Sequence, residues 1–236
     1  MKVGVISDLH VEFMSDTKDM IPLLPECDLL LVAGDFCCGA QKREALRVLG
    51  DNCNQAVLVM GNHDYWETNI MSYRPREVLS DVCPSNVHIL DGSYVVIDGY
   101  EIFGATLWFG DHPNVPVFAH QMNDFSRIED FWPGVIAVNQ MHRSMLAAKR
   151  FDIVVTHHMP LPLGGRHGGG LDLFYYTDMS NMMEVMGPKL WAFGHTHKPE
   201  DMEVFNTRVV SNPYGYHGFS VNEEFRDVVI DMDLLS

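Results

Sequence analysis

Residues 2–10 read Lys-Val-Gly-Val-Ile-Ser-Asp-Leu-His, so that a short apolar run leads directly into an acid and a histidine. Four later apolar runs end in the same way, in Gly34-Asp35, Gly61-Asn62-His63-Asp64, Thr156-His157-His158 and Gly194-His195-Thr196-His197. Short runs rich in Val, Leu and Ile are typical of strands that are buried on both faces. The sequence therefore predicts five strands with polar groups at their carboxyl ends.

Helical patterns separate several of these runs and cover residues 41–49, 73–81 and 135–149. The last pattern follows Pro133-Gly134 and ends in Lys149-Arg150, as expected of a helix with positive charge in its last turn. The alternation of strands and helices predicts an α/β fold, in which ligands bind beyond the carboxyl ends of the strands.

Further β-structure is expected at a hairpin turning at Asp98-Gly99 and in three runs within residues 202–230. The sheet is then either mixed or divided into two packed sheets. Residues 109–133 and 159–174 have the composition of surface loops. Because the sequence has no internal repeat, linker or break in composition, we expect one domain over residues 1–236.

The composition excludes several classes of protein. The chain has 236 residues, with 16 Lys and Arg against 32 Asp and Glu, and its net charge of -16 disfavours nucleic-acid and membrane partners. No apolar run approaches the roughly 18 residues of a membrane span, and the first run turns polar too early for a signal peptide. The five cysteines form no paired spacing, so we expect a cytoplasmic protein without disulfides, whose oligomeric state is left open.

The polar ends of the strands supply side chains of types that commonly bind metal ions: Asp8, His10, Asp35, Asn62, His157, His195 and His197. Residues two apart in an extended chain point to the same side, so Asp8 should converge with His10 and His195 with His197. Taken singly, each block could be a turn, a cap or a structural histidine. Together they offer more oxygen and imidazole ligands than one tetrahedral ion uses, which favours two ions that share a carboxylate.

These five blocks match, in order, the signature blocks of the calcineurin-like metallophosphoesterases, which the chain resembles from residue 7 to residue 197. The resemblance implies a four-layer αββα sandwich of two mixed β-sheets flanked by helices, in a small member without a cap. It further implies that Asp8, His10 and His197 hold one metal and that Asn62, His157 and His195 hold a second. Asp35 would bridge the two metals, and His63 would protonate the leaving oxygen.

Such a centre would hydrolyse phosphodiesters or phosphomonoesters of small molecules, nucleotides among them, by a hydroxide that bridges the metals. The expected ions are two Mn, with Fe, Zn or Ni as alternatives, because the donors combine oxygen with imidazole nitrogen. The substrate phosphate would contact Asn62 and His63, and it would contact Arg166 or the neighbouring His167 in a glycine-rich segment.

The sequence departs from the protein phosphatase branch of this family, whose second block continues Gly-Asp-x-x-Asp-Arg-Gly. Here the run is Gly34-Asp35-Phe36-Cys37-Cys38-Gly39, without the carboxylate that would orient the catalytic imidazole and without the arginine. Protein phosphatase activity is therefore not expected. Cys37 and Cys38 are either redox-sensitive neighbours of the metals or small residues that fill space, and the second interpretation is favoured.

Several other residues keep two interpretations. Asp64 could orient His63 or cap the following helix, and His158 should belong to the core or support a ligand. Four aromatic residues could stack on a nucleobase, although packing is the favoured interpretation: Trp108, Phe109, Phe131 and Trp132.

Two other functions compete with a small-molecule phosphoesterase. The first is a nuclease of the same superfamily, which the net charge disfavours. The second is a non-catalytic metal-binding interaction scaffold, as in the retromer subunit that shares this fold, although such relatives lose ligands. A structural zinc protein fits less well, because structural zinc sites are usually rich in cysteine.

Overall fold

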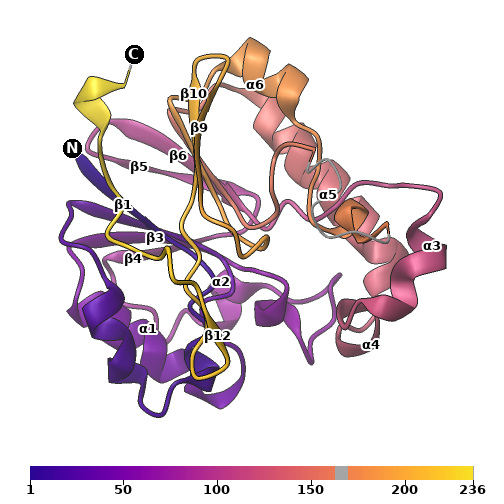
Figure 1. The fold of residues 1–236 in the computed structure, drawn as a ribbon, viewed down its shortest axis with the longest axis horizontal. Coiled ribbons are helices and arrows are strands. Elements are labelled where there is room, and N and C mark those ends of the chain that lie inside the picture. Colours follow the sequence, from indigo (N-terminus) through magenta and orange to yellow (C-terminus); the bar gives the residue numbers. More distant parts are fainter. Residues whose placement is uncertain (163–169, 236) are drawn as a thin grey trace.

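The computed structural model describes residues 1–162 and 170–235, which form two mixed β-sheets packed face to face (Figure 1). The first sheet has the order β13 (Val229–Asp231), β1 (Lys2–Ile6), β2 (Leu29–Ala33), β3 (Gln55–Val59) and β4 (Val87–Leu90). The second has the order β5 (Ser93–Ile97), β6 (Tyr100–Ala105), β7 (Ile153–Thr156), β8 (Leu190–Phe193), β10 (Thr207–Ser211) and β9 (Glu200–Val204). Strands β13, β5 and β9 run antiparallel to their neighbours at sheet edges, and the remaining strands of both sheets are parallel.

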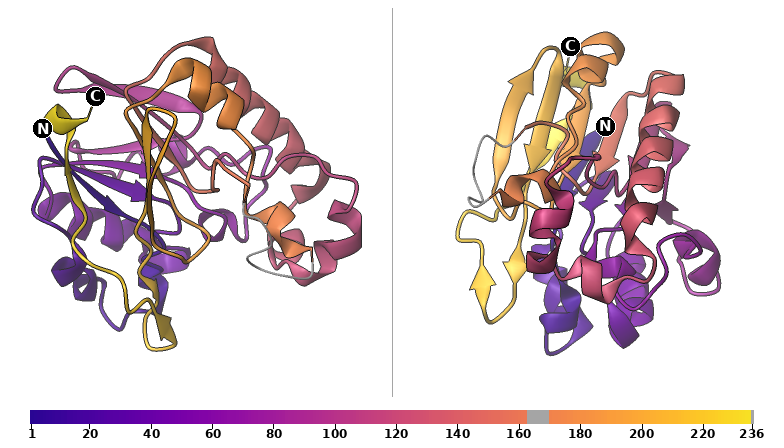
Figure 2. Two further views of the ribbon diagram at one scale, coloured as in Figure 1. Left: turned by 45° about the horizontal axis from the view of Figure 1, so that its top comes forward. Right: turned by 90° about the vertical axis from the view of Figure 1, so that its right-hand side faces the viewer.

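Helices cover the outer faces of both sheets and complete the four layers (Figure 2). The first sheet packs against α1 (Lys42–Asp51), with α2 (Pro75–Val78) beside it, and the second against α5 (Phe131–Ala148) and α6 (Ser180–Met186). Two short helices, α3 (Val115–Phe118) and α4 (Asp124–Arg127), precede α5. The 3-10 helices are Val11–Phe13, Thr17–Leu23, Gly39–Gln41, His63–Tyr65, Ala119–Gln121, Leu171–Phe174 and Met232–Leu234.

The apolar runs are uninterrupted because both faces of each central strand are buried. In β2, Leu29, Leu31 and Ala33 face the second sheet. The alternate residues Leu30 and Val32 pack on the helical side with Leu46 of α1. Strands with this pattern can only be interior strands of a layered fold, as predicted.

Most of the predicted elements form, with differences at their ends. The helix predicted at residues 41–49 is α1, and the one at 135–149 is α5, which begins earlier and has non-helical backbone at Trp132. The pattern at 73–81 forms only the single turn α2, because its buried side chains are too few to fix a longer helix on the sheet. The predicted hairpin joins β5 to β6, with positive φ at Asp98 (49°) and Gly99 (83°).

The C-terminal part holds more strands than the three predicted. Besides β9, β10 and β13, the small sheet of β11 (Gly215–Tyr216) and β12 (Ser220–Val221) forms a hairpin that lies beside the ends of the parallel strands. Over residues 1–162 and 170–235, no helix is both long enough and apolar enough to cross a membrane.

Candidate metal centre

All seven predicted ligands lie at the carboxyl ends of parallel strands. Asp8 and His10 follow β1, Asp35 follows β2, and Asn62 follows β3. From the second sheet, His157 follows β7, and both His195 and His197 follow β8. The centre is therefore built by the facing edges of both sheets.

Asp8 and His10 converge on one group of ligand atoms, whereas His195 and His197, which were also expected to converge, contribute to different groups. Neither pair has the alternating backbone of an extended strand that its spacing predicts. Asp8, His10, His195 and His197 all have left-handed backbone, with φ of 52°, 45°, 67° and 52°. Asp35 shares this conformation with φ of 48°. Non-glycine residues adopt it at a cost, and such strain is found at functional sites where the surrounding structure enforces it.

Glycines in the blocks are required by the close packing of these ligands. A Cβ atom on Gly61 would collide with the carboxylate and backbone nitrogen of Asp35, and one on Gly194 would lie 2.7 Å from Oδ2 of Asp8. The Gly-Asn and Gly-His sequences at these strand ends thus reflect steric necessity as well as turn formation.

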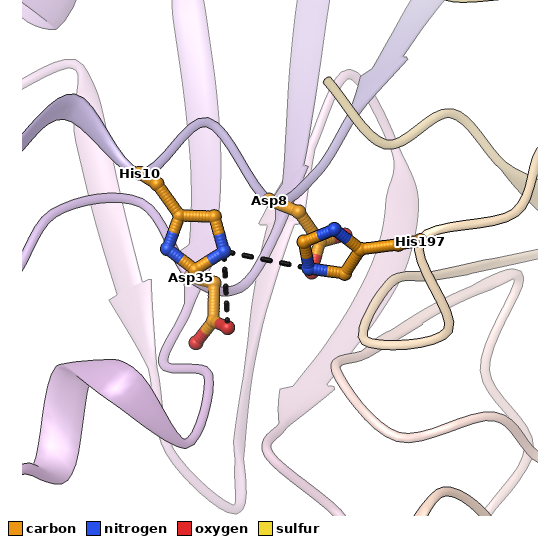
Figure 3. Close-up of side chains that lie close together, drawn as sticks. All are labelled: Asp8, His10, Asp35 and His197. Carbon is orange, nitrogen blue, oxygen red and sulfur yellow. Dashed lines mark hydrogen bonds and ion pairs between the residues drawn. The ribbon is translucent and has the colours of Figure 1, made fainter. Parts of the chain in front are cut away.

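The first group of ligand atoms comes from Asp8, His10, Asp35 and His197, which lie within 4.8 Å of one another (Figure 3). Nε2 of His10 lies 3.5 Å from Nε2 of His197 and 3.6 Å from Oδ2 of Asp35. Nδ1 of His10 contacts Oε1 of Glu12 at 3.3 Å, which places the ring proton on that side and leaves the Nε2 lone pair facing the group. Lone pairs and carboxylates directed at one point suit a divalent cation.

The second group comes from Asp35, His157 and His195, with the amide of Asn62 beside them. Nε2 of His157 lies 3.5 Å from Oδ1 of Asp35 and 3.0 Å from Oδ1 of Asn62. The other ring nitrogen of His157 contacts the carbonyl of Ala33 at 2.9 Å, and Nε2 of His195 contacts that of Phe174 at 3.3 Å. Carbonyls accept the ring protons, so the remaining nitrogens are free to bind a cation.

Asp35 belongs to both groups, with one carboxylate oxygen directed at each. Burial, followed by the charges of Asp8 and Asp64, raises the pKa of Asp35 well above its usual range. Burial likewise lowers the pKa of His157 and His195. A divalent cation would stabilise crowded acids and neutral imidazoles that are buried together in this way.

His63 lies on the wall of the site. Its ring stacks on Trp66 with centroids 3.6 Å apart, and its backbone N–H donates to Oδ1 of Asp35 at 2.9 Å. Burial and the neighbouring histidines, His10 first, lower the pKa of His63 to about 2. Its Nδ1 atom has no hydrogen-bond partner within the described residues, and Glu12 lies 3.9 Å away.

Glu12 is a residue that the sequence analysis missed. Its Oε2 accepts from the backbone N–H of Cys38 at 3.1 Å, while its Oε1 lies near both His10 and His63. A nitrogen or oxygen of each of His10, Glu12 and His63 also lies within 4.8 Å of the others. The second sequence block lacks the carboxylate that would orient the catalytic imidazole, and Glu12 is instead the carboxylate that lies near His63. The only sequence signal was its spacing of two from His10.

Asp64 neither orients His63 nor caps a helix through its side chain. Its Oδ2 accepts from the backbone N–H groups of Gly61 and Phe36 at 2.9 and 3.3 Å, and its Oδ1 pairs with the buried Lys42 at 3.2 Å. Asp64 therefore joins the second and third blocks beneath the centre.

Replacing Lys42 with methionine should lower the free energy of unfolding by about 3–5 kcal/mol, because the buried Asp64 carboxylate then has no cation beside it. Urea unfolding of the metal-free protein measures this, with Lys18→Met at an exposed position as the control. A loss no larger than that of the control would show that backbone donors alone stabilise Asp64.

Most of the other residues singled out in the sequence are buried packing residues in the described part of the chain. Burial raises the pKa of Cys37, and burial and Glu12 raise that of Cys38 to about 12, which favours the space-filling interpretation of both thiols. His158 is buried, with its ring 4.2 Å from that of His195 and Nδ1 3.2 Å from the carbonyl of Thr106. Trp108, Phe109 and Phe131 lie in the core, whereas Trp132 is partly exposed. Arg166 and His167 lie outside the described residues.

A cleft of about 360 Å³ opens over the two groups. Its walls combine site residues with Trp66, Gln121, Met122, Asp124, Tyr175, Thr196 and Tyr216, among others. Tyr216 of the β11–β12 hairpin stacks on His10 with centroids 4.3 Å apart, and Tyr175 stacks on His195 at 4.6 Å. Sequence reasoning missed these wall residues because no strand-end pattern marks them.

Comparison with known proteins gives one family and several structures. A family model described as calcineurin-like phosphoesterase matches residues 1–199. The phosphopantetheinyl hydrolase of Mycobacterium tuberculosis is 19% identical, with 91% of this chain and 89% of that chain covered and a TM-score of 0.72. An archaeal phosphodiesterase is 16% identical (98% and 100% covered, TM-score 0.42), and zinc-bound Vps29 of Entamoeba histolytica is 14% identical (98% and 86% covered, TM-score 0.40). No curated protein matches the chain. At 19% identity, the likeness to the phosphopantetheinyl hydrolase shows the fold alone.

Proposed function

The chain belongs to the calcineurin-like phosphoesterase family, and from this we propose that it hydrolyses phosphodiesters or phosphomonoesters of small molecules with two divalent metal ions. The observation that carries the proposal is Asp35, whose two oxygens face two separate groups of ligands. One shared carboxylate between two sets of imidazole and oxygen donors is what a pair of adjacent cations requires.

In this proposal Asp8, His10 and His197 hold one ion, Asn62, His157 and His195 hold the other, and Asp35 contributes to both. When bound, such ions neutralise the negative oxygens of a phosphate ester and acidify a water molecule at neutral pH. Mn is the ion we propose, with Fe, Zn or Ni as alternatives that the same donors accept.

The residues of the chain supply the remaining chemistry. His63 lines the cleft beside Asp35, where its imidazole would face the leaving oxygen of a bound ester. We assign it the transfer of a proton to the leaving oxygen, since an alkoxide is a poor leaving group without one. In the same proposal Asn62 and His63 contact the substrate phosphate. Arg166 is also proposed to contact it, on the sequence alone.

The cleft favours a small substrate. Among its described lining residues, no lysine or arginine is present to track a nucleic-acid backbone, and the chain has a net charge of -16. Its aromatic walls, Trp66, Tyr175 and Tyr216, suit the apolar part of an organic leaving group. These features disfavour the nuclease alternative.

Metal-stripped protein reloaded with Mn should hydrolyse bis-p-nitrophenyl phosphate or p-nitrophenyl phosphate, and the comparison of the two rates tests the proposal. Faster cleavage of the diester identifies a phosphodiesterase, and faster cleavage of the monoester identifies a phosphatase. Absence of cleavage with Mn, Fe, Ni and Zn would contradict the proposal in favour of the scaffold. Salt-dependent binding and cleavage of DNA would favour the nuclease.

A further inference from the structure

Asp124, the first residue of α4, is a buried carboxylate beside the candidate metal centre. It is 3% exposed, and among the described residues it forms no ion pair. Its Oδ1 accepts from Nδ2 of Asn62 at 2.9 Å and from Nε1 of Trp66 at 2.8 Å, and Oδ2 also lies 3.2 Å from Nδ2 of Asn62. A donor from the third block and one that lies two residues beyond it therefore meet at one carboxylate.

The contact with Asn62 decides which end of its amide faces the centre. A carboxylate accepts hydrogen bonds and donates none, so the NH2 group of Asn62 must be the end that faces Asp124. The amide oxygen then points to the opposite side, where it lies 3.0 Å from Nε2 of His157. Only this oxygen can bind a cation, since an amide NH2 group has no free lone pair for a metal.

The hydrogen bond from Trp66 to Asp124 also bears on His63, because Trp66 packs against the His63 ring. The indole stacks on the His63 ring at 3.6 Å with an angle of 27° between the planes. The guanidinium of Arg127 also lies over this indole, 4.5 Å from the ring centre. Since Nδ1 of His63 has no hydrogen-bond partner in the described part of the chain, this stack is a principal restraint on the plane of its ring.

We propose that Asp124 is a positioning residue that turns the amide oxygen of Asn62 toward the second metal and holds Trp66 against His63. The inference rests on the proposed metal-binding role of Asn62. It concerns a segment, residues 109–133, in which the sequence predicts only a surface loop.

The variant Asp124→Asn tests the proposal with little change of volume. The oxygen of the new amide can still accept from both donors in the place of Oδ1, but its NH2 group then takes the place of Oδ2 and opposes the NH2 group of Asn62. Rotation of the Asn62 amide by half a turn relieves that conflict but points NH2 at the metal side. We expect the affinity for the second Mn ion to fall by about 10–100-fold, the usual effect of removing such a supporting contact.

The double variant Asn62→Asp with Asp124→Asn should restore the binding. The new asparagine accepts from Trp66 and donates to the new aspartate, which keeps its second oxygen for the metal. Asn62→Asp alone should bind less well than the double variant, because two buried carboxylates then face each other. A double variant weaker than both single variants would overturn the proposal.

Two readouts separate this inference from the proposed function. Equilibrium dialysis measures the number and affinity of bound Mn ions, and the indole N–H resonance of Trp66, assigned with Trp66→Phe, reports its hydrogen bond in metal-free protein. Ser126→Ala, which removes a hydrogen bond to the Asn123 carbonyl at the start of α4, is the control and should change neither.

Wild-type protein that binds fewer than two ions contradicts the proposed function. Unchanged Mn affinity or an unchanged indole resonance in Asp124→Asn overturns the role of Asp124.

Discussion

Replacing Asp35 with asparagine should leave a folded protein that no longer retains two metal ions. Each oxygen of Asp35 faces a different group, so the loss of its charge weakens both groups at once. We expect kcat/KM to fall by about 10²–10³-fold, the scale seen when one electrostatic group is removed from an active site. Metal analysis after dialysis and steady-state kinetics measure the two effects.

The control for Asp35→Asn is Asp91→Asn, which alters a carboxylate that accepts from Tyr65 away from the two ligand groups. In metal-free protein, Asp35→Asn should melt no lower than wild type, because it removes one of several crowded carboxylates. Retention of two metal ions in this variant would contradict the bridging assignment. A lower melting temperature would instead show that Asp35 has a structural role.

Replacing His63 with alanine should reduce the rate of ester hydrolysis most for esters with the poorest leaving groups. General acid catalysis contributes about 10²–10⁴-fold, so we expect a loss of this size on an alkyl phosphate ester. A p-nitrophenyl ester expels a stable anion and should lose less than roughly tenfold. Burial holds the imidazole neutral in the free protein, and the negative charge of a bound ester would raise its pKa toward the protonated form.

Metal content should stay at the wild-type value in His63→Ala, since the ring is not one of the assigned ligands. His88→Ala is the matched control, because His88 lies on β4 and contacts Gln55 away from the centre. Equal losses on the alkyl and p-nitrophenyl esters would remove His63 from the role of proton donor. Loss of metal in the same variant would place it among the ligands.

The strands and the meeting of the seven candidate ligands at one edge could be predicted because both depend on local sequence. Each apolar run is long enough for one buried strand, and each polar end follows it directly, so parallel strands bring the seven side chains to one edge. The conformation at those ends could not be predicted. Asp8 and His10 take left-handed backbone because their N–H groups bond to the carbonyls of Gly34 and Asp35, in a block distant in sequence.

The site residues that the sequence did not reveal, Asp124 and Tyr216, were missed for a different reason. Asp124 lies in a polar segment, where a single aspartate is ordinarily solvated, and only the folded chain brings Asn62 and Trp66 to it. Tyr216 belongs to a two-residue strand, which is too short to give a periodic signal. Their importance comes from contacts between distant segments, and no pattern within one segment encodes such contacts.

The division of the candidate ligands between the two sheets would link metal binding to the stability of the sandwich. Asp8, His10, Asp35 and Asn62 extend from one sheet, and His157, His195 and His197 extend from the other. Ions held by both sets would form coordinate bonds across the interface between the sheets, in addition to its apolar contacts. Any sliding or separation of the two sheets would then require release of the ions, so the free energy of metal binding adds to the resistance of the whole domain to unfolding.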